Sequence, residues 1–242
     1  MIRRALIIYC NNTKSGKLPG PDSDNNNLIK HLTSNLGGNW YNSEILSLPN
    51  PTIKQVESAV ITHLKDTDYS FVVFSGHGGI NIIDNKQYIE LKDGDIAVNK
   101  LFSNAKRQTI IIDACRSHYT PGIKLFSDSL IKSFESVAGT LSTRSLFDKH
   151  ILNCEEGLTI LYAASENQSA SDSDNGAAYL SSLLKVCMIW EKEDTENTKL
   201  SLKTAHKKGS IYMKNHFDTI QNPIIKPEKR KKYYPLAVKY IP

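Results

Sequence analysis

The sequence lacks the paired cysteines of a disulfide framework or a zinc site. Its four cysteines are far apart and form no CxxC pair: Cys10, Cys115, Cys154 and Cys187. Scattered, unpaired cysteines are typical of proteins in a reducing compartment. We therefore predict a cytoplasmic protein without a structural metal.

Long apolar runs and phosphate-binding fingerprints are also missing. No apolar stretch approaches the ~20 residues that a membrane span needs, and the first one, within residues 1–10, is shorter than the ~7–15-residue core of a signal peptide. We expect no membrane partner. Neither GxGxxG nor GxxxxGK[ST] follows any predicted strand, which argues against a nucleotide-binding domain.

Neither sign of charge is in large excess. The chain has 30 Lys and Arg against 25 Asp and Glu, a net charge of +5, and several of the basic residues lie in the segment KPEKRKK at 226–232. A short basic run is most often a solvated loop, so nucleic acid is not an expected partner. The length of 242 residues and 40% hydrophobic content predict one globular domain over residues 1–242.

Continuous apolar runs are separated by amphipathic segments along the chain. This pattern predicts a mostly parallel sheet covered by helices on both faces. The predicted strands are 5–9, 41–48, 69–76, 109–113 and 157–165, with a hairpin at 80–91 and terminal strands at 222–225 and 234–241. The predicted helices are 28–38 with Asp22 or Asp24 as N-cap, 49–65 with a Thr52/Gln55 capping box, 94–105, 129–135, 142–149, 176–192 and 200–217.

Reactive side chains follow two of the predicted buried strands. The segment SGHGG at 75–79 follows one, and DACR at 113–116 follows another. The carboxyl ends of parallel strands meet at one edge of a sheet, where functional groups gather. His77 and Cys115 are therefore predicted to form a nucleophilic dyad. His118 is the alternative base, and the alternative for Cys115 is a core thiol.

A thiol with a pKa near 8.5 is only a few per cent thiolate at neutral pH, so a neighbouring imidazole is needed to activate it. The glycines beside His77 indicate that the backbone approaches a ligand closely. The N–H groups of Gly78 and Cys115 are predicted to stabilise a tetrahedral oxyanion.

The two motifs FVVFSGHGG and IIIDACRS resemble those of the caspase/metacaspase clan of cysteine peptidases, peptidase family C14. The caspase signature is matched only as ACR, and the His-to-Cys separation is shorter than the ~50 residues of caspases. These departures favour metacaspases and bacterial caspase-like peptidases. LPGPDSD at 18–24, LYAASENQSASD at 161–172, QNP at 221–223 and the closing PLAV also resemble segments of the family.

The resemblance implies a caspase-like three-layer α/β/α sandwich with a mostly parallel, roughly six-stranded central sheet. It also divides the chain into a large-subunit-like part at 1–118, an inter-subunit-like loop at 119–157 and a small-subunit-like part at 158–242. Family members often cleave themselves in such a loop. The implied self-cleavage sites are Arg144, expected to be the most exposed, and Lys149, Lys132 and Lys124.

The resemblance further places the S1 subsite on Asp24, Ser75, Asp113 and Pro21, the last standing where metacaspases have a cysteine. Two carboxylates near the nucleophile favour a cationic P1 side chain, so we predict protein substrates cleaved after Arg or Lys. The alternative roles are a helix N-cap for Asp24 and a turn cap for Asp113.

No cofactor is predicted. Some metacaspases use calcium, but the approach to the Cys115 strand carries no carboxylate here, and Asp93 with Asp95 falls short of the six to eight oxygen ligands that calcium prefers. No prodomain is recognised, so an activating partner or upstream protease is expected. The resemblance also implies a role in bacterial defence or cell death. The alternative function is a catalytically silent caspase-like scaffold.

Overall fold

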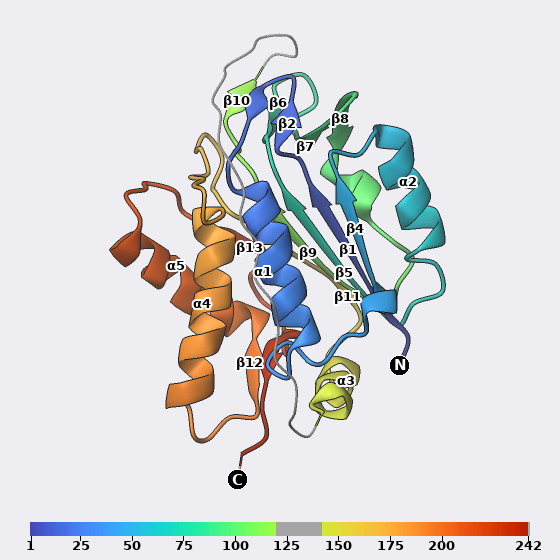
Figure 1. Cartoon of the computed structure of the whole chain (residues 1–242), viewed down its shortest axis with the longest axis vertical. Helices are drawn as coiled ribbons and strands as arrows, with labels where there is room; N and C mark the ends of the chain where they lie inside the picture. The colour runs from blue at the N-terminus through green and yellow to red at the C-terminus, as the bar shows by residue number, and fades with distance from the viewer. Residues whose placement is uncertain (120–141, 242) are drawn as a thin grey trace.

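The structure is a computed structural model that describes residues 1–119 and 142–241. Its centre is a six-stranded sheet in the order β13-β11-β9-β5-β1-β4 (Figure 1). All neighbours pair in parallel except β13, which is antiparallel to β11. The strands are β1 (Arg3–Tyr9), β4 (Ile45–Pro49), β5 (Tyr69–Ser75), β9 (Arg107–Asp113), β11 (Gly157–Tyr162) and β13 (Ile224–Lys226). The predicted fold class is confirmed.

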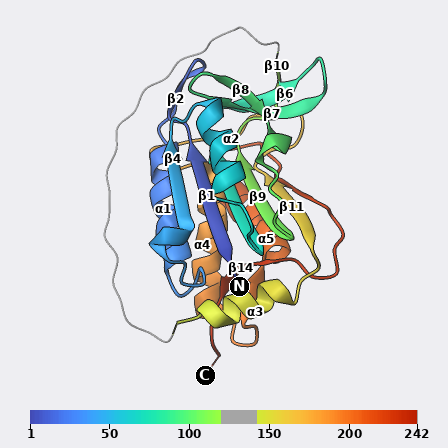
Figure 2. The ribbon, with the colours of Figure 1, turned by 90° about the vertical axis from the view of Figure 1, so that its right-hand side faces the viewer.

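Each face of this sheet has its own hydrophobic core, which explains why its strands are apolar without alternation. Ile7, Val73 and Ile111 pack on one face with α1 (Pro21–Thr33), α4 (Ala178–Glu193) and α5 (Leu202–His216). Ile8 and Phe74 pack on the other face with α2 (Ile53–Thr62). Figure 2 shows α2 in front of the strands and α4 and α5 behind them, so the chain forms three layers.

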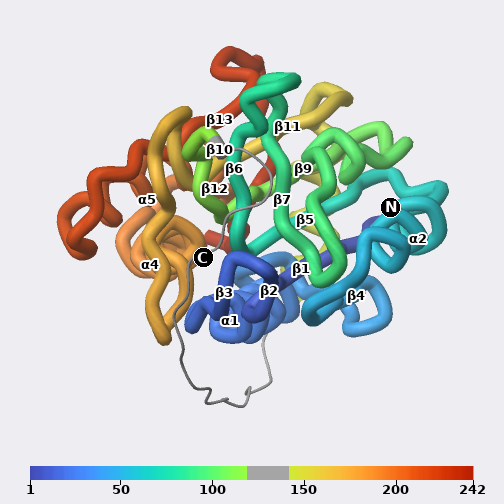
Figure 3. Tube along the Cα trace, turned by 90° about the horizontal axis from the view of Figure 1, so that it is seen from above, coloured from blue at the N-terminus to red at the C-terminus, as the bar shows by residue number. Residues whose placement is uncertain are grey.

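A second, four-stranded sheet lies beyond the carboxyl ends of the central strands (Figure 3). It consists of β10 (His118–Tyr119), β6 (Gly78–Asn81), β7 (Lys86–Leu91) and β8 (Gly94–Ala97), so the predicted hairpin is confirmed. The predicted helix at 94–105 is wrong. Pairing of β8 with β7 buries Ile96 opposite Ile89, and only the 3-10 turn η2 (Val98–Leu101) follows.

The first helix begins earlier than predicted. Pro21 is its first residue and Gly20 its N-cap, because proline is pre-organised for the first helical turn. Asp22 and Asp24 therefore lie inside the helix, and the predicted N-cap role for either is wrong. The Thr52/Gln55 capping box of α2 is confirmed.

The remaining elements surround these layers. The turn before α1 carries β2 (Asn12–Thr13) and β3 (Gly16–Lys17), and η1 (Asn42–Glu44) precedes β4. Helix α3 (Arg144–Leu152) precedes β11, and β12 (Lys199–Ser201) pairs with β14 (Pro235–Val238). The predicted helix at 129–135 lies outside the described residues. Within the part described, no helix is long and apolar enough to cross a membrane.

Candidate active site

The segments that carry His77 and Cys115 run side by side. Ser75 pairs with Asp113 at the end of β5 and β9, and Ile80 pairs with His118 where β6 and β10 begin. The register is the same before and after the two residues, so they occupy matching positions of neighbouring segments. The Gly76 N–H donates to the Asp113 carbonyl at 3.2 Å, which keeps the segments together as they leave the sheet.

Gly78 is a glycine for a steric reason. A Cβ atom there would lie 2.7 Å from the Tyr88 carbonyl oxygen and 3.0 Å from the Ala114 Cβ. The Glu90 N–H donates to the His77 carbonyl at 2.9 Å, which makes Gly78 and Ile89 a non-hydrogen-bonded pair of the β6–β7 ladder. The Gly78 N–H is therefore not used by the ladder.

Cys115 differs from the other cysteines in its exposure. It is half-buried, whereas Cys10, Cys154 and Cys187 are buried. Burial raises the pKa of Cys10 to about 12 and raises the pKa of the other two buried thiols. The Sγ atom of Cys115 accepts a hydrogen bond from the Ala170 N–H at 3.3 Å. The Gln87 side-chain amide donates to the backbone carbonyl of Cys115 at 3.0 Å.

His77 has one ring nitrogen without a partner. Its Nε2 is buried and forms no hydrogen bond among the described residues. Burial lowers the pKa of His77, and this outweighs the upward effects of Glu90 and of a hydrogen bond with the Gly16 backbone. The imidazole is therefore neutral near pH 7, with Nε2 available to take a proton. Glu90 also accepts from the Ser15 N–H at 3.0 Å, which fixes the turn that carries Gly16.

Three carboxyl groups converge beside these residues, and we call Asp24, Asp113 and Asp172 the acidic cluster. The Ser75 hydroxyl donates to Oδ2 of Asp24 at 2.6 Å, and the Ala177 N–H donates to its Oδ1 at 3.0 Å. The Leu180 N–H donates to Oδ2 of Asp113 at 2.8 Å. One oxygen of Asp113 and one of Asp172 are buried with no hydrogen-bond partner among the described residues.

The pKa values of the acidic cluster are all raised. Burial raises the pKa of Asp24 to about 7, with a smaller contribution from Asp172. Burial and the charge of Asp24 raise the pKa of Asp113 well above its usual value, and burial raises that of Asp172. A cationic side chain placed among these carboxyls would stabilise their ionised forms and donate hydrogen bonds to their free oxygens.

Asp172 was not identified from the sequence. The segment that contains it was recognised only as resembling the family, and its carboxyl lies more than fifty positions from that of Asp113 in the chain. The Gly20 N–H donates to Oδ2 of Asp172 at 3.0 Å, so the loop before α1 and the loop before α4 meet at this carboxyl. Only folding brings it to the acidic cluster.

Gln221 is a second residue that sequence reasoning missed. It is fully buried, and its amide donates to the Ala163 carbonyl at 2.9 Å while its Oε1 accepts from the Ser171 N–H at 2.7 Å. It thereby fixes the segment that carries Ala170 and Asp172. The sequence signal was QNP at 221–223, which was noted without a role.

Arg116 holds the same segment from the other side. Its guanidinium lies 4.5 Å from the centroid of the Tyr162 ring and pairs with Glu166 at 3.4 Å. Its backbone N–H donates to the Gln168 carbonyl at 2.8 Å. These contacts position the chain beside Cys115.

The structure gives Asp113 the capping contact weighed as its alternative role, because it accepts the Leu180 N–H in the first turn of α4. That contact uses one oxygen only. Pro21 is buried at the first position of α1, one helical turn before Asp24. His118, the alternative base, is exposed in β10.

The expectation that Arg144 is the most exposed of the candidate cleavage sites is wrong, because Lys149 is more exposed. The Arg144 side chain is 21% exposed, and its guanidinium donates two hydrogen bonds to Glu44, at 2.5 and 2.7 Å. It begins α3, and Lys149 is exposed on the same helix. Lys124 and Lys132 lie outside the described residues.

No group of three or more His, Cys, Asp or Glu side chains in the described ranges is arranged to hold a metal ion. Asp93, considered as a calcium ligand, accepts the Ile53 N–H at 2.8 Å at the start of α2.

A model of the caspase domain matches residues 2–234. The chain belongs to the caspase family. Members of this family are typically cysteine peptidases that act on protein substrates. The crystal structure of caspase-1 from Spodoptera frugiperda is similar, with a TM-score of 0.61 and 14% sequence identity over 93% of this chain and 87% of that one. This similarity shows a shared fold. No curated protein sequence matches the chain.

Proposed function

We propose that this caspase-family protein is a cysteine endopeptidase that cleaves proteins after Arg or Lys, with Cys115 as nucleophile and His77 as base. One observation carries the proposal: a half-buried thiol and an imidazole with a free, buried Nε2 occupy matching positions of adjacent segments, beside three raised-pKa carboxyls. Both membership of the family and this chemistry support peptide hydrolysis.

In the proposed reaction His77 takes the proton of the Cys115 thiol, and the thiolate attacks the carbonyl carbon of the P1 residue. The Ala170 N–H, which already donates to Sγ, stabilises the thiolate. The developing oxyanion accepts from the Gly78 and Cys115 N–H groups. His77 then gives its proton to the leaving amine. A water molecule, deprotonated by His77, hydrolyses the thioester and releases the acid product.

The acidic cluster is the proposed S1 subsite. Asp24 already uses both oxygens, on Ser75 and on Ala177, so it holds the site in shape and contributes charge. The unpartnered oxygens of Asp113 and Asp172 are the acceptors for a P1 guanidinium or ammonium group. We therefore add Asp172 to the proposed S1 residues, which are Asp24, Ser75, Asp113 and Pro21. A P1 aspartate would be repelled.

The direct test is labelling with an acyloxymethyl ketone carrying Arg at P1. We expect one adduct, on Cys115, and none in Cys115→Ala. A matched reagent with Asp at P1 should label far more slowly. Labelling of Cys115→Ala at the wild-type rate, or equal labelling by both reagents, would contradict the proposal. An intact dyad with no labelling would instead favour the scaffold role.

Self-processing within 119–157 is a second part of the proposal. Arg144 and Lys149 lie in α3, and peptidases bind extended chain, so the start of this helix must unwind before either is cut. Incubation of the purified protein followed by intact-mass analysis tests this, with Cys115→Ala as the uncleavable control. A fully active preparation that keeps its intact mass would exclude obligatory processing. The division into parts at 1–118 and 158–242 rests on the same proposal.

The proposed setting is a bacterial defence or cell-death system, with activation by a partner or an upstream protease. Its support is the resemblance of the motifs to bacterial caspase-like peptidases. Proteomic comparison of cells that express the wild type or Cys115→Ala under stress would test it through new protein ends after Arg or Lys.

A further inference from the structure

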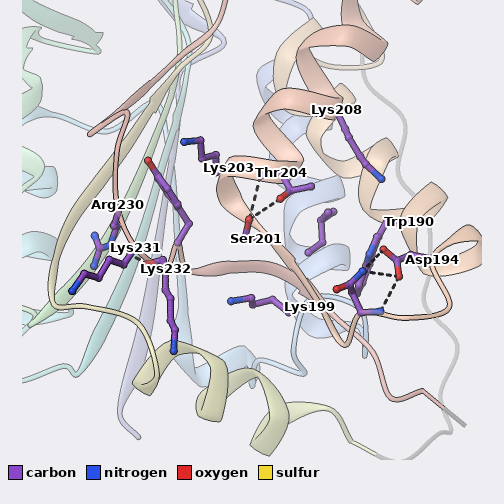
Figure 4. Close-up of a pocket in the computed structure, with 13 residues that line it drawn as sticks. Trp190, Asp194, Lys199, Ser201, Lys203, Thr204, Lys208, Arg230, Lys231 and Lys232 are labelled. Atoms are coloured by element: carbon purple, nitrogen blue, oxygen red, sulfur yellow. Dashed lines mark hydrogen bonds between the residues drawn. The ribbon is translucent and has the colours of Figure 1, made fainter.

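The other end of the molecule carries a basic hollow. It has a volume of about 420 Å³ and lies between the end of α4, the β12–α5 junction and residues 230–233 (Figure 4). Six cationic side chains line it: Lys199, Lys203, Lys208, Arg230, Lys231 and Lys232. Arg230 reaches the start of β11, donating to the Glu156 carbonyl and to the Thr159 hydroxyl, both at 3.2 Å. The hollow is therefore at the opposite end of β11 from the acidic cluster.

Most of these cations have no counter-charge. Lys199, Lys208, Lys231 and Lys232 form no ion pair within the described part of the chain. Asp194 is the one carboxylate in the lining, and its Oδ1 accepts from the N–H groups of Glu196 and Asn197 at 3.0 and 2.8 Å. It faces its own turn and leaves the lysines unneutralised.

Three of the positive charges lie close enough together to act on one neighbouring group. Lys199, Arg230 and Lys232 each lower the pKa of the Cys154 thiol, although burial raises it overall. Basic residues from two distant chain segments, at 199 and at 230–232, therefore add to the same positive potential. The N-terminus of α5 adds to it, because Ser201 caps a 15-residue helix at the wall of the hollow. Like charges held together without counter-ions raise the free energy of the empty site.

We propose that the basic hollow binds a compact polyphosphate anion, either inorganic or the phosphate chain of a nucleotide. Pockets of 300–1,000 Å³ suit small ligands. Lysine is a flexible point charge that suits phosphate oxygens at several orientations. The proposed anion site is separate from the candidate active site and does not depend on the protein being a peptidase.

Nucleic acid fits the hollow less well than a small anion. Single-stranded nucleic acid is held by stacking its bases on exposed aromatic rings. The two aromatic residues of the lining, Trp190 and Tyr233, are only 2% and 5% exposed. The Lys239 ammonium also lies 4.7 Å from the centroid of the Trp190 ring, so one face of that ring is already covered.

Isothermal titration of the full-length protein with inorganic tripolyphosphate at ~0.15 M salt, the physiological ionic strength, tests the proposal. We expect one site per chain. The combined variant Lys199→Gln, Lys231→Gln and Lys232→Gln should bind at least about tenfold more weakly. The matched control is Lys54→Gln, Lys65→Gln and Lys92→Gln, which removes the same charge from exposed positions elsewhere and should bind as the wild type does.

ATP and orthophosphate distinguish the sources of the anion. Equal affinity for ATP and tripolyphosphate assigns recognition to the phosphate chain, and tighter ATP binding assigns it to a nucleotide. If the triple variant fails to fold, the double variant at the exposed Lys231 and Lys232 replaces it. Affinity weaker than about 1 mM, an equal loss in the control, or tighter binding of a single-stranded oligonucleotide through the same lysines would overturn the proposal.

Discussion

The acidic cluster and the basic hollow lie at opposite ends of the same sheet and differ in burial as well as in the sign of their charge. Asp24 and Asp113 are each 2% exposed, whereas Lys231 and Lys232 are exposed. Burial raises the pKa of each clustered carboxyl, because the charged form loses its hydration. The exposed lysines of the hollow keep much of their hydration. The modest net charge of +5 conceals both features.

The difference indicates how each end would select a ligand. A desolvated carboxyl with a free oxygen gains strongly from a single cation that hydrogen-bonds to it. A solvated lysine gains little from one anionic group, so several must act together. We therefore expect single substitutions to matter at the acidic cluster and combined substitutions to matter at the basic hollow.

Replacing the nucleophile should have the largest effect. Cys115→Ala is expected to lower hydrolysis of an Arg-terminated fluorogenic peptide on the order of 10⁴-fold or more, since the thiolate forms the covalent intermediate. Tripolyphosphate binding should not change, because the hollow lies at the other end of β11. Steady-state kinetics and titration calorimetry on one preparation measure both. Joint loss of the two activities would mean that the ends are not independent.

Neutralising an S1 carboxyl should come next. Asp113→Asn keeps the shape but removes a charge-assisted hydrogen bond, so we expect kcat/KM for Arg peptides to fall about 10- to 100-fold. The exposed Asp218→Asn is the charge-matched control and should be silent. Kinetics with Arg-, Lys- and Asp-terminated peptides measure the change. Unaltered Arg preference in Asp113→Asn and also in Asp172→Asn would remove these residues from S1.

Loosening the segment beside Cys115 should have an intermediate effect. Gln221→Ala removes the contacts to Ala163 and Ser171 and is expected to lower kcat about tenfold, because a misplaced Ala170 N–H no longer meets Sγ. The change should fall on kcat more than on KM. Thermal unfolding at one pH separates this effect from global destabilisation. A variant with lower stability and wild-type kcat would assign Gln221 to folding alone.

The smallest effect is a pH dependence of stability. The pKa of Asp24 is about 7 in the folded chain, against about 3.9 for an exposed aspartate. Between these values the folded state holds a proton that the unfolded state has released, so the unfolding free energy falls as the pH rises through this window. Asp24→Asn should therefore gain stability relative to the wild type as the pH rises from about 4 to about 7.

Denaturant unfolding of both proteins at several pH values between about 4 and 8 checks this prediction. The gain of Asp24→Asn relative to the wild type should shrink as the pH falls towards the lower value, where the wild-type carboxyl is protonated in both states. A constant difference across the range would show that Asp24 does not titrate in it.

The sequence by itself determined the strands of the central sheet and the two principal candidates for the dyad. Fully apolar runs such as 71–74 form strands only when both faces are covered, so a mostly parallel, helix-covered sheet followed from the pattern. Strand-end placement then selected His77 and Cys115 without any coordinates. The prediction at 94–105 failed because helical propensity is weak, and pairing of Ile96 with Ile89 outweighed it.

Only the tertiary structure decided what surrounds the candidate dyad. Asp172 and Gln221 reach it from loops distant in the chain, and no local pattern distinguishes their side chains from solvated ones. The basic hollow likewise needs residues 199–208 and 230–232 to meet across a β12–β14 pair. Periodicity records which side of an element is buried, but the partner that buries it, and hence the charge and pKa of each group, depends on contacts between distant segments.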